Sequence, residues 1–184
     1  MDKLTEIVAI LTGDFTNASQ YERLTLEAQK TFPYAVHKNH WLNDKIIGLP
    51  TDFIGELIHE ESYYTLRGKE KFKSDIFLFT YTETGQVQLI AIDAPKAATN
   101  CPFNQLTTIS FDELSKSEKF TPLVYTYQNG QFAGKSQSMF TKKTRFILEQ
   151  TLSADELVIK EEMYNGDKQI FGFDTPIIYK KEAV

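Results

Sequence analysis

A change in hydrophobic period near residue 33 constrains the fold of this chain more than any other feature. Before it, Leu4, Ile7, Val8 and Leu11 recur at helical spacing, which predicts one amphipathic helix. After it, apolar residues alternate in short runs, which predict strands at 34–41, 52–64, 72–82, 86–93, 122–127, 131–136, 144–151, 156–163, 168–173 and 177–180. About nine or ten short strands with regular turns are typical of an antiparallel barrel or sandwich. We therefore expect an all-β antiparallel barrel whose leading helix plugs one end.

Short turn sequences separate these runs. Thr84-Gly85, Asn129-Gly130 and Asn165-Gly166 each lie between two predicted strands. An Asn-Gly pair favours a type I′ turn, because both of its residues tolerate a positive φ. The sequence therefore predicts three hairpins, two of them with type I′ turns. A capping box over 110–113 predicts a short helical turn in the connection between strands.

The segment that joins the helix to the strands carries its own signals. Gly13 is placed to end the first helix. Asn17 can cap a second helix that runs to about Gln29 and stops before Pro33. We expect Phe15 to be buried against one end of the barrel, with Asp14 or Asn17 tying the helix to a strand.

Length and charge limit the classes of function. The 184 residues fit one domain, residues 1–184. The net charge is −5 and no basic block is present, so nucleic acid is not the expected partner. The sequence has no run of about 18 apolar residues, so we expect no membrane span. The N-terminus does not have the pattern of a signal peptide. With Cys101 as the single cysteine, these features favour the cytoplasm.

Several motifs, taken in order, resemble the CpcT/CpeT family of phycobiliprotein chromophore lyases. Each matches a family pattern in type and position rather than in full identity, and together they span nearly the whole chain. They are Gly13-Asp-Phe-Thr-Asn17 with Gln20, Ile58-His-Glu-Glu-Ser-Tyr63, Lys71-Phe72-Lys73, Leu106-Thr-Thr-Ile-Ser-Phe-Asp-Glu-Leu114, Asn129-Gly-Gln-Phe-Ala-Gly134, Gln169-Ile-Phe-Gly172 and Ile178-Tyr-Lys180.

This resemblance implies a calycin-like barrel that holds a bilin, a linear tetrapyrrole. Where the family carries cysteines, this chain reads Phe120-Thr-Pro122 and Ser136-Gln-Ser138. We therefore expect a non-covalent binder of a small hydrophobic or carboxylate-bearing ligand. The alternative is a lyase that attaches a bilin to a cysteine of an acceptor phycobiliprotein, since the attacking thiol belongs to the acceptor. A third hypothesis is an interaction module whose barrel is filled by its own side chains.

Four residues are candidates for contact with that ligand. The resemblance points to Glu60 and Tyr63, but strand alternation puts them on opposite faces unless a bulge at Glu60-Glu61 intervenes. A carboxylate inside a barrel could bind pyrrole N–H groups or a cation. Lys73 could hold a ligand carboxylate at a barrel mouth. Tyr125 lies on an aromatic stripe that could line a cavity or simply form core.

Other chemistry has weaker support in the sequence. His37 and His40 have a spacing that suits a metal on a helix, but this segment is strand-like and lacks further ligands nearby. No nucleophile–base signature and no glycine-rich phosphate loop is evident. We expect no metal site and no separate cofactor, and Cys101 lies in a loop outside the motif regions.

Overall fold

The predicted strands pair into a closed antiparallel barrel, as expected. The computed structural model describes residues 2–182. Ten of its strands form the barrel wall, and the β11–β12 pairing closes it. In chain order they are β1 (Gly13–Thr16), β2 (Tyr34–Trp41), β4 (Glu56–Leu66), β5 (Lys69–Tyr81), β6 (Val87–Asp93), β9 (Leu123–Gln128), β10 (Gln131–Met139), β11 (Thr144–Leu152), β12 (Glu156–Asn165) and β14 (Ile177–Lys181).

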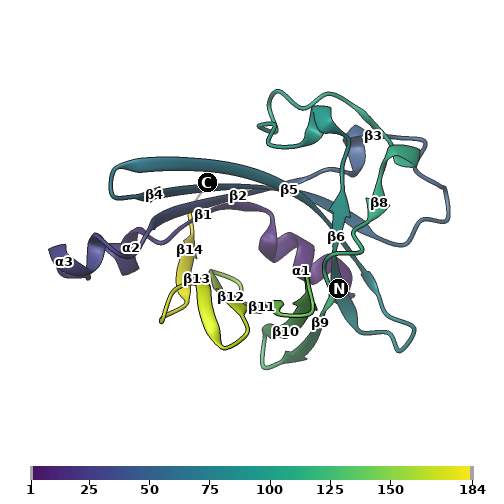
Figure 1. Cartoon of the computed structure of the whole chain (residues 1–184). Coiled ribbons are helices and arrows are strands. Elements are labelled where there is room, and N and C mark those ends of the chain that lie inside the picture. Colours follow the sequence, from purple (N-terminus) through teal and green to yellow (C-terminus); the bar gives the residue numbers. More distant parts are fainter. Residues whose placement is uncertain (1, 183–184) are drawn as a thin grey trace.

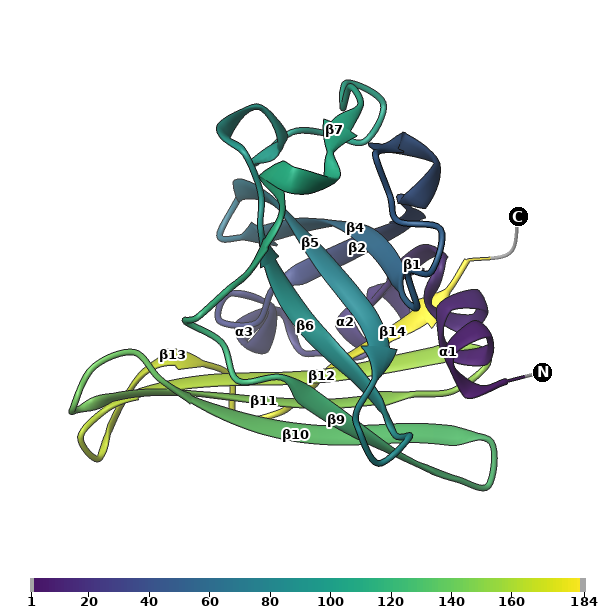
Figure 2. The ribbon, with the colours of Figure 1, turned by 90° about the vertical axis from the view of Figure 1, so that its right-hand side faces the viewer.

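Neighbours in the wall are mostly neighbours in sequence. The order around the barrel is β11-β10-β9-β6-β5-β4-β2-β1-β14-β12. Two short strands extend the sheet, since β13 (Lys168–Gly172) pairs with β12 and β8 (Ser115–Lys116) pairs with β6. Outside the wall, β3 (Ile46–Ile47) and β7 (Ile109–Ser110) form a separate parallel pair. Figures 1 and 2 place this pair above the side of the barrel that β4, β5 and β6 form.

Helix α1 (Lys3–Leu11) plugs one end of the barrel. Figure 1 shows it between the β5 side of the wall and the β10–β11 side. Its predicted stripe, Leu4, Ile7, Val8 and Leu11, is buried in the same core as strand residues from across the barrel. Polar contacts fix both ends of the helix. The Tyr81 hydroxyl donates to Asp2, the residue that caps α1, and Lys181 Nζ donates to the carbonyls of Ala9 and Ile10.

The other helical segments are short. The expected second helix is broken into α2 (Ala18–Tyr21) and α3 (Leu26–Gln29), because Thr25 caps a new helical turn through Ala28 N–H. Short 3₁₀ turns lie at Asn43–Lys45, Lys96–Ala98 and Phe111–Glu113, the last with the predicted capping box. In the described residues, every helix is too short for a membrane crossing.

The link after α1 matches the prediction in part. Gly13 directly follows Thr12, the C-cap of α1, as predicted, and it also begins strand β1, where its φ of 126° suits glycine. Asn17 does not cap α2 with its side chain. Instead its amide donates to the Pro33 carbonyl and accepts from Ala35 N–H. Asn17 therefore ties the end of β1 to the start of β2, a link between two strands rather than the expected link between the helix and a strand.

The hairpin positions are confirmed, but one turn type is not. Asn129 and Gly130 both have positive φ, as a type I′ turn requires. At the third site the turn residues are Gly166 and Asp167, and only Gly166 has a positive φ. This pattern indicates a type II′ turn, which needs glycine at its first position alone. Arg67 and Gly68 form a further turn with two positive φ values between β4 and β5.

We predict that Phe15→Ala destabilises the fold strongly. Phe15 is fully buried on β1 among residues of the barrel core. Removing its ring leaves a cavity, which typically lowers the free energy of unfolding by about 3–5 kcal/mol. Chemical denaturation measures this loss. Asp14→Ala on the outward face of the same strand is the control, and a similar loss in both variants would contradict the core role of Phe15.

Candidate functional site

Strand β4 decides which side chains enter the barrel. Its pairing with β2 and with β5 is continuous from Ile58 to Thr65, so the bulge considered at Glu60-Glu61 does not occur. Regular alternation therefore holds. Ile58 packs in the interior core, and Glu60 and Tyr64 share its face. Glu61 and Tyr63 lie on the outer face.

The interior is divided into an apolar half and a polar half. The apolar half surrounds α1. In the other half, polar side chains enter from five wall strands, and we call them the interior polar cluster: His37 and Asn39 on β2, Glu60 and Tyr64 on β4, Lys73 and Asp75 on β5, Glu161 on β12 and Tyr179 on β14. Strand pairing alone brings the β4 and β5 members side by side, since Glu60 lies opposite Asp75.

His37 lies at the centre of the hydrogen bonds in this cluster. The hydroxyl oxygens of Tyr64 and Tyr179 are each 3.0 Å from its Nε2 atom. Its Nδ1 atom lies 3.5 Å from a Glu60 carboxylate oxygen. Burial raises the pKa of Tyr64 and of Tyr179, and nearby carboxylates add to both shifts. Both phenols therefore stay neutral.

The two inner glutamates have pKa values shifted in opposite directions. Burial tends to raise the pKa of Glu60, but His37 and the Ser62 hydroxyl outweigh it and hold that pKa below its ordinary value. Burial raises the pKa of Glu161, and the negative charge of Glu60 raises it further. Within the part of the chain that the structure describes, no hydrogen bond or ion pair reaches the Glu161 carboxylate. The charged form of Glu60 is thus stabilised in the fold, whereas the charged form of Glu161 is destabilised.

Lys73 and Asp75 lie at the margin of the cluster. Lys73 Nζ is 2.7 Å from Asp75 Oδ2, and the Lys73 side chain is 63% exposed. Strand β6 pairs with β5 only over Ile76–Tyr81, and β9 pairs with β10 only through Gly134. The hydrogen-bonded wall is therefore incomplete beside the first half of β5. Exposure rises from His37 (3%) through Glu60 (13%) to Lys73, so solvent reaches the cluster from this side.

Asn39 is the most unusual member of the cluster. It is 1% exposed and lies directly opposite Glu60 in the β2–β4 pairing. Neither its amide nitrogen nor its amide oxygen has a hydrogen-bond partner among residues 2–182. An unpaired buried polar group costs about 1–3 kcal/mol. A ligand with both donors and acceptors would remove this cost.

Tyr63 serves a different region, on the outside of the wall. Its hydroxyl donates to Glu61, and Glu61 also accepts the N–H of Phe103. Phe103 belongs to a segment that covers the outer face of β4–β6, residues 94–114, which we call the outer strap. Lys45 holds the strap through the carbonyl of Phe103, at 3.1 Å. Burial and the hydrogen bond to Glu61 raise the pKa of Tyr63 to about 12.

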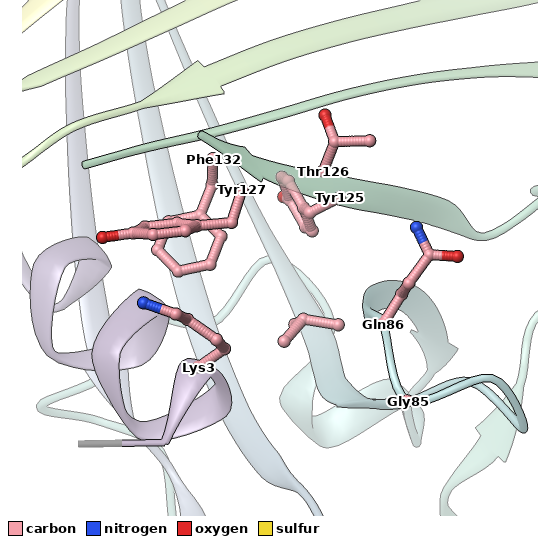
Figure 3. Close-up of a pocket in the computed structure, with 8 residues that line it drawn as sticks. Lys3, Gly85, Gln86, Tyr125, Thr126, Tyr127 and Phe132 are labelled. Atoms are coloured by element: carbon pink, nitrogen blue, oxygen red, sulfur yellow. The ribbon is translucent and has the colours of Figure 1, made fainter. Parts of the chain in front are cut away.

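Two cavities border the barrel, and each contains one predicted residue. The first, of 320 Å³, lies where the start of α1 meets the β5–β6 turn and strands β9–β10 (Figure 3). Tyr125 lines it, and its hydroxyl donates to Gln150 inside the barrel. Lys3 crosses this cavity toward the Tyr127 ring, 3.4 Å from the ring centroid. The second cavity, of 380 Å³, lies along β2, β4 and β5, and Tyr63 and Phe72 are among its lining residues.

The structure thus brings together two of the four residues predicted to contact a ligand. Glu60 and Lys73 belong to the interior polar cluster, and each shifts the pKa of the other. Tyr125 shares the interior but lies toward the plugged end, and Tyr63 lies outside. His37 and His40 point to opposite faces, since His40 stacks on Phe103 of the outer strap. In residues 2–182, no three His, Cys, Asp or Glu side chains form a metal-binding group.

Comparison with known proteins adds no relative. No protein-family model, curated protein or solved structure matches the chain significantly. The site must therefore be interpreted from its own geometry.

We predict that Glu161→Gln stabilises the protein at neutral pH. A carboxyl group whose pKa is raised on folding contributes stability below its unfolded value, near 4.5, and loses that contribution as the pH rises through the folded value. Glutamine stays neutral at every pH. The free energy of unfolding of the variant should therefore exceed that of the wild type at pH 7–8, and the two should converge near pH 4.

Denaturant titrations across this range measure the difference. Glu162→Gln is the matched control, because Glu162 is the next residue of β12, lies on the other face and pairs with Lys160 at 3.1 Å. A destabilised Glu161→Gln protein at pH 7 would show that the carboxylate has a stabilising partner.

Proposed function

We propose that this protein is a small-molecule-binding barrel whose ligand occupies the interior polar cluster. A linear tetrapyrrole is the ligand that the resemblance to CpcT/CpeT proteins suggests. The observation that carries the proposal is the buried Asn39 amide with both atoms unpaired, beside the Glu60 carboxylate. Native proteins rarely leave such groups unsatisfied unless a site requires it.

The chemistry of a linear tetrapyrrole is complementary to this arrangement. Its pyrrole N–H groups can donate to Glu60 and to the oxygen of Asn39. Its propionate groups carry negative charge and suit Lys73, which is the exposed cation at the margin of the cluster. The apolar core around α1 would border the rings of a ligand bound in the cluster. The acceptors Glu60 and Asn39 inside the barrel therefore match the pyrrole N–H groups at the centre of a bilin. Lys73 at the margin matches its propionate groups.

Binding can be tested directly by mixing the protein with phycocyanobilin and following its absorbance. We expect a spectral shift that saturates with protein concentration. Glu60→Gln should weaken binding by about tenfold to a hundredfold, because it removes a charged hydrogen-bond acceptor. Lys73→Gln should weaken it less, because the side chain is exposed.

A pair of adjacent tyrosines gives the control. Tyr64→Phe removes a hydroxyl from the interior polar cluster, whereas Tyr63→Phe removes one from the outer face. Only the first should change the bilin spectrum. A folded protein with no spectral shift, or equal effects of the two variants, would contradict the proposal.

We further predict that bound bilin is released on denaturation. Cys101 lies on the outer strap, where its N–H donates to Ser74 on the outer face of β5, and the interior serines are poor nucleophiles without a base. Cys101→Ser should therefore leave binding unchanged. Denaturing electrophoresis with fluorescence detection is the measurement, and pigment that remains on the wild-type chain would contradict a non-covalent site. Faster, site-selective attachment to an apo-phycobiliprotein than in a protein-free control would extend the function to that of a lyase.

A further inference from the structure

The interior polar cluster carries more negative than positive groups. Three carboxyl groups, those of Glu60, Asp75 and Glu161, face two basic side chains. Lys73 is engaged by Asp75 at 2.7 Å, and His37 is the neighbour of Glu60 at 3.5 Å. This leaves Glu161 without a basic partner in the described chain. Glu161 is half-buried, and a carboxylate that is partly removed from water is unfavourable unless a charge or hydrogen-bond donors compensate it.

A second, independent observation points to a missing ligand. Both atoms of the Asn39 amide lack a partner among residues 2–182, although the residue is almost fully buried and lies opposite Glu60, and the amide oxygen is the acceptor that a donor on a ligand would satisfy. Glu60 and Asn39 come from adjacent strands, and Glu161 comes from β12. Glu161 lies on the inward face of β12, the face that carries Leu157 and Ile159 into the core. The inward faces of β2, β4 and β12 thus all carry oxygen acceptors, and Lys73, the exposed cation at the margin, is already engaged by Asp75.

We infer that the interior polar cluster binds an organic cation whose charged N–H groups donate to Glu60, Glu161 and the Asn39 oxygen. This inference rests on the proposed function of the barrel as a small-molecule binder. A metal ion is a poorer fit, because residues 2–182 bring no three carboxyl, imidazole or thiol groups into ligating geometry. An amidinium or protonated pyrrole nitrogen instead offers planar donors to separate acceptors. A bilin bound here would accordingly be protonated on its nitrogens.

Three probes of nearly equal shape isolate the effect of charge. Benzamidine is a cation, benzamide is neutral and benzoate is an anion. Isothermal titration calorimetry at pH 7.5 should show benzamidine binding at least about tenfold more tightly than benzamide, with benzoate weakest, as expected for charged hydrogen bonds. Affinity for benzamidine should fall as the pH is lowered and Glu161 takes up a proton.

Variants then test the residues. Glu161→Gln and Asn39→Leu should each weaken benzamidine binding by about tenfold, whereas Glu162→Gln on the outer face should leave it unchanged. The free energy of unfolding of each variant is the control for misfolding, since Glu161→Gln is expected to stabilise the protein while it weakens binding. A variant that lost both stability and affinity would indicate a structural role and overturn the assignment of Glu161.

The outcomes separate this inference from the proposed function. If phycocyanobilin shifts in absorbance but benzoate binds as well as benzamidine, the barrel is a binder and the cation inference is wrong. If Glu161→Gln does not change benzamidine affinity, the inference also fails. If none of the probes binds and phycocyanobilin shows no shift, both proposals fail together.

Discussion

The burial of α1 in one end of the barrel is the interaction on which the rest of the structure depends. Its apolar stripe packs in the same core as strand residues from across the barrel, and α1 is the longest helix in residues 2–182. The helix is held at both ends by strand residues, through Tyr81 at Asp2 and through Lys181 at the last carbonyls. Because the apolar half of the interior surrounds α1, the polar side chains of the wall are confined to the other half, where the strand pairing is incomplete.

Much of the fold could be predicted from the sequence, because alternation and turn residues are local signals. Strand β2 was predicted at its observed bounds, and the turns at Gly85, Gly130 and Gly166 define three hairpins. The link after α1 could not be predicted so well. Gly13-Asp-Phe-Thr has too few residues for a visible period, and it becomes a strand only because β2 and β14 offer edges on both sides. The expected long helix failed because Thr25 starts a new cap.

The site was less predictable, because it depends on which face of each strand turns inward. On β4 both faces carry glutamate and tyrosine, so composition could not choose between Glu60 and Glu61. The outer strap decides which glutamate faces outward, since it buries Glu61 against Phe103. The strap consists of irregular loops, which have no periodic signal in the sequence. Glu161 was missed although a signal existed. It interrupts the apolar row Leu157, Ile159 and Met163 on β12, which marks a polar group that faces the interior.

The interior polar cluster is costly to the fold, and this cost is the strongest argument that it has a function. A core of the same shape could place apolar residues at Asn39 and Glu161 without loss of any hydrogen bond, because neither side chain forms one in the described structure. The outer glutamate differs, since Glu61 holds the strap and has structural partners. Polar groups that destabilise the unliganded protein can stabilise a complex, because a ligand that satisfies them adds its binding free energy to the folded state. The Asn39 amide and the Glu161 carboxylate are the inward groups that a ligand of the proposed kind would satisfy. His59, on the outer face of β4, also has two ring nitrogens without a partner among residues 2–182, so an unpaired polar group is not confined to the inner face.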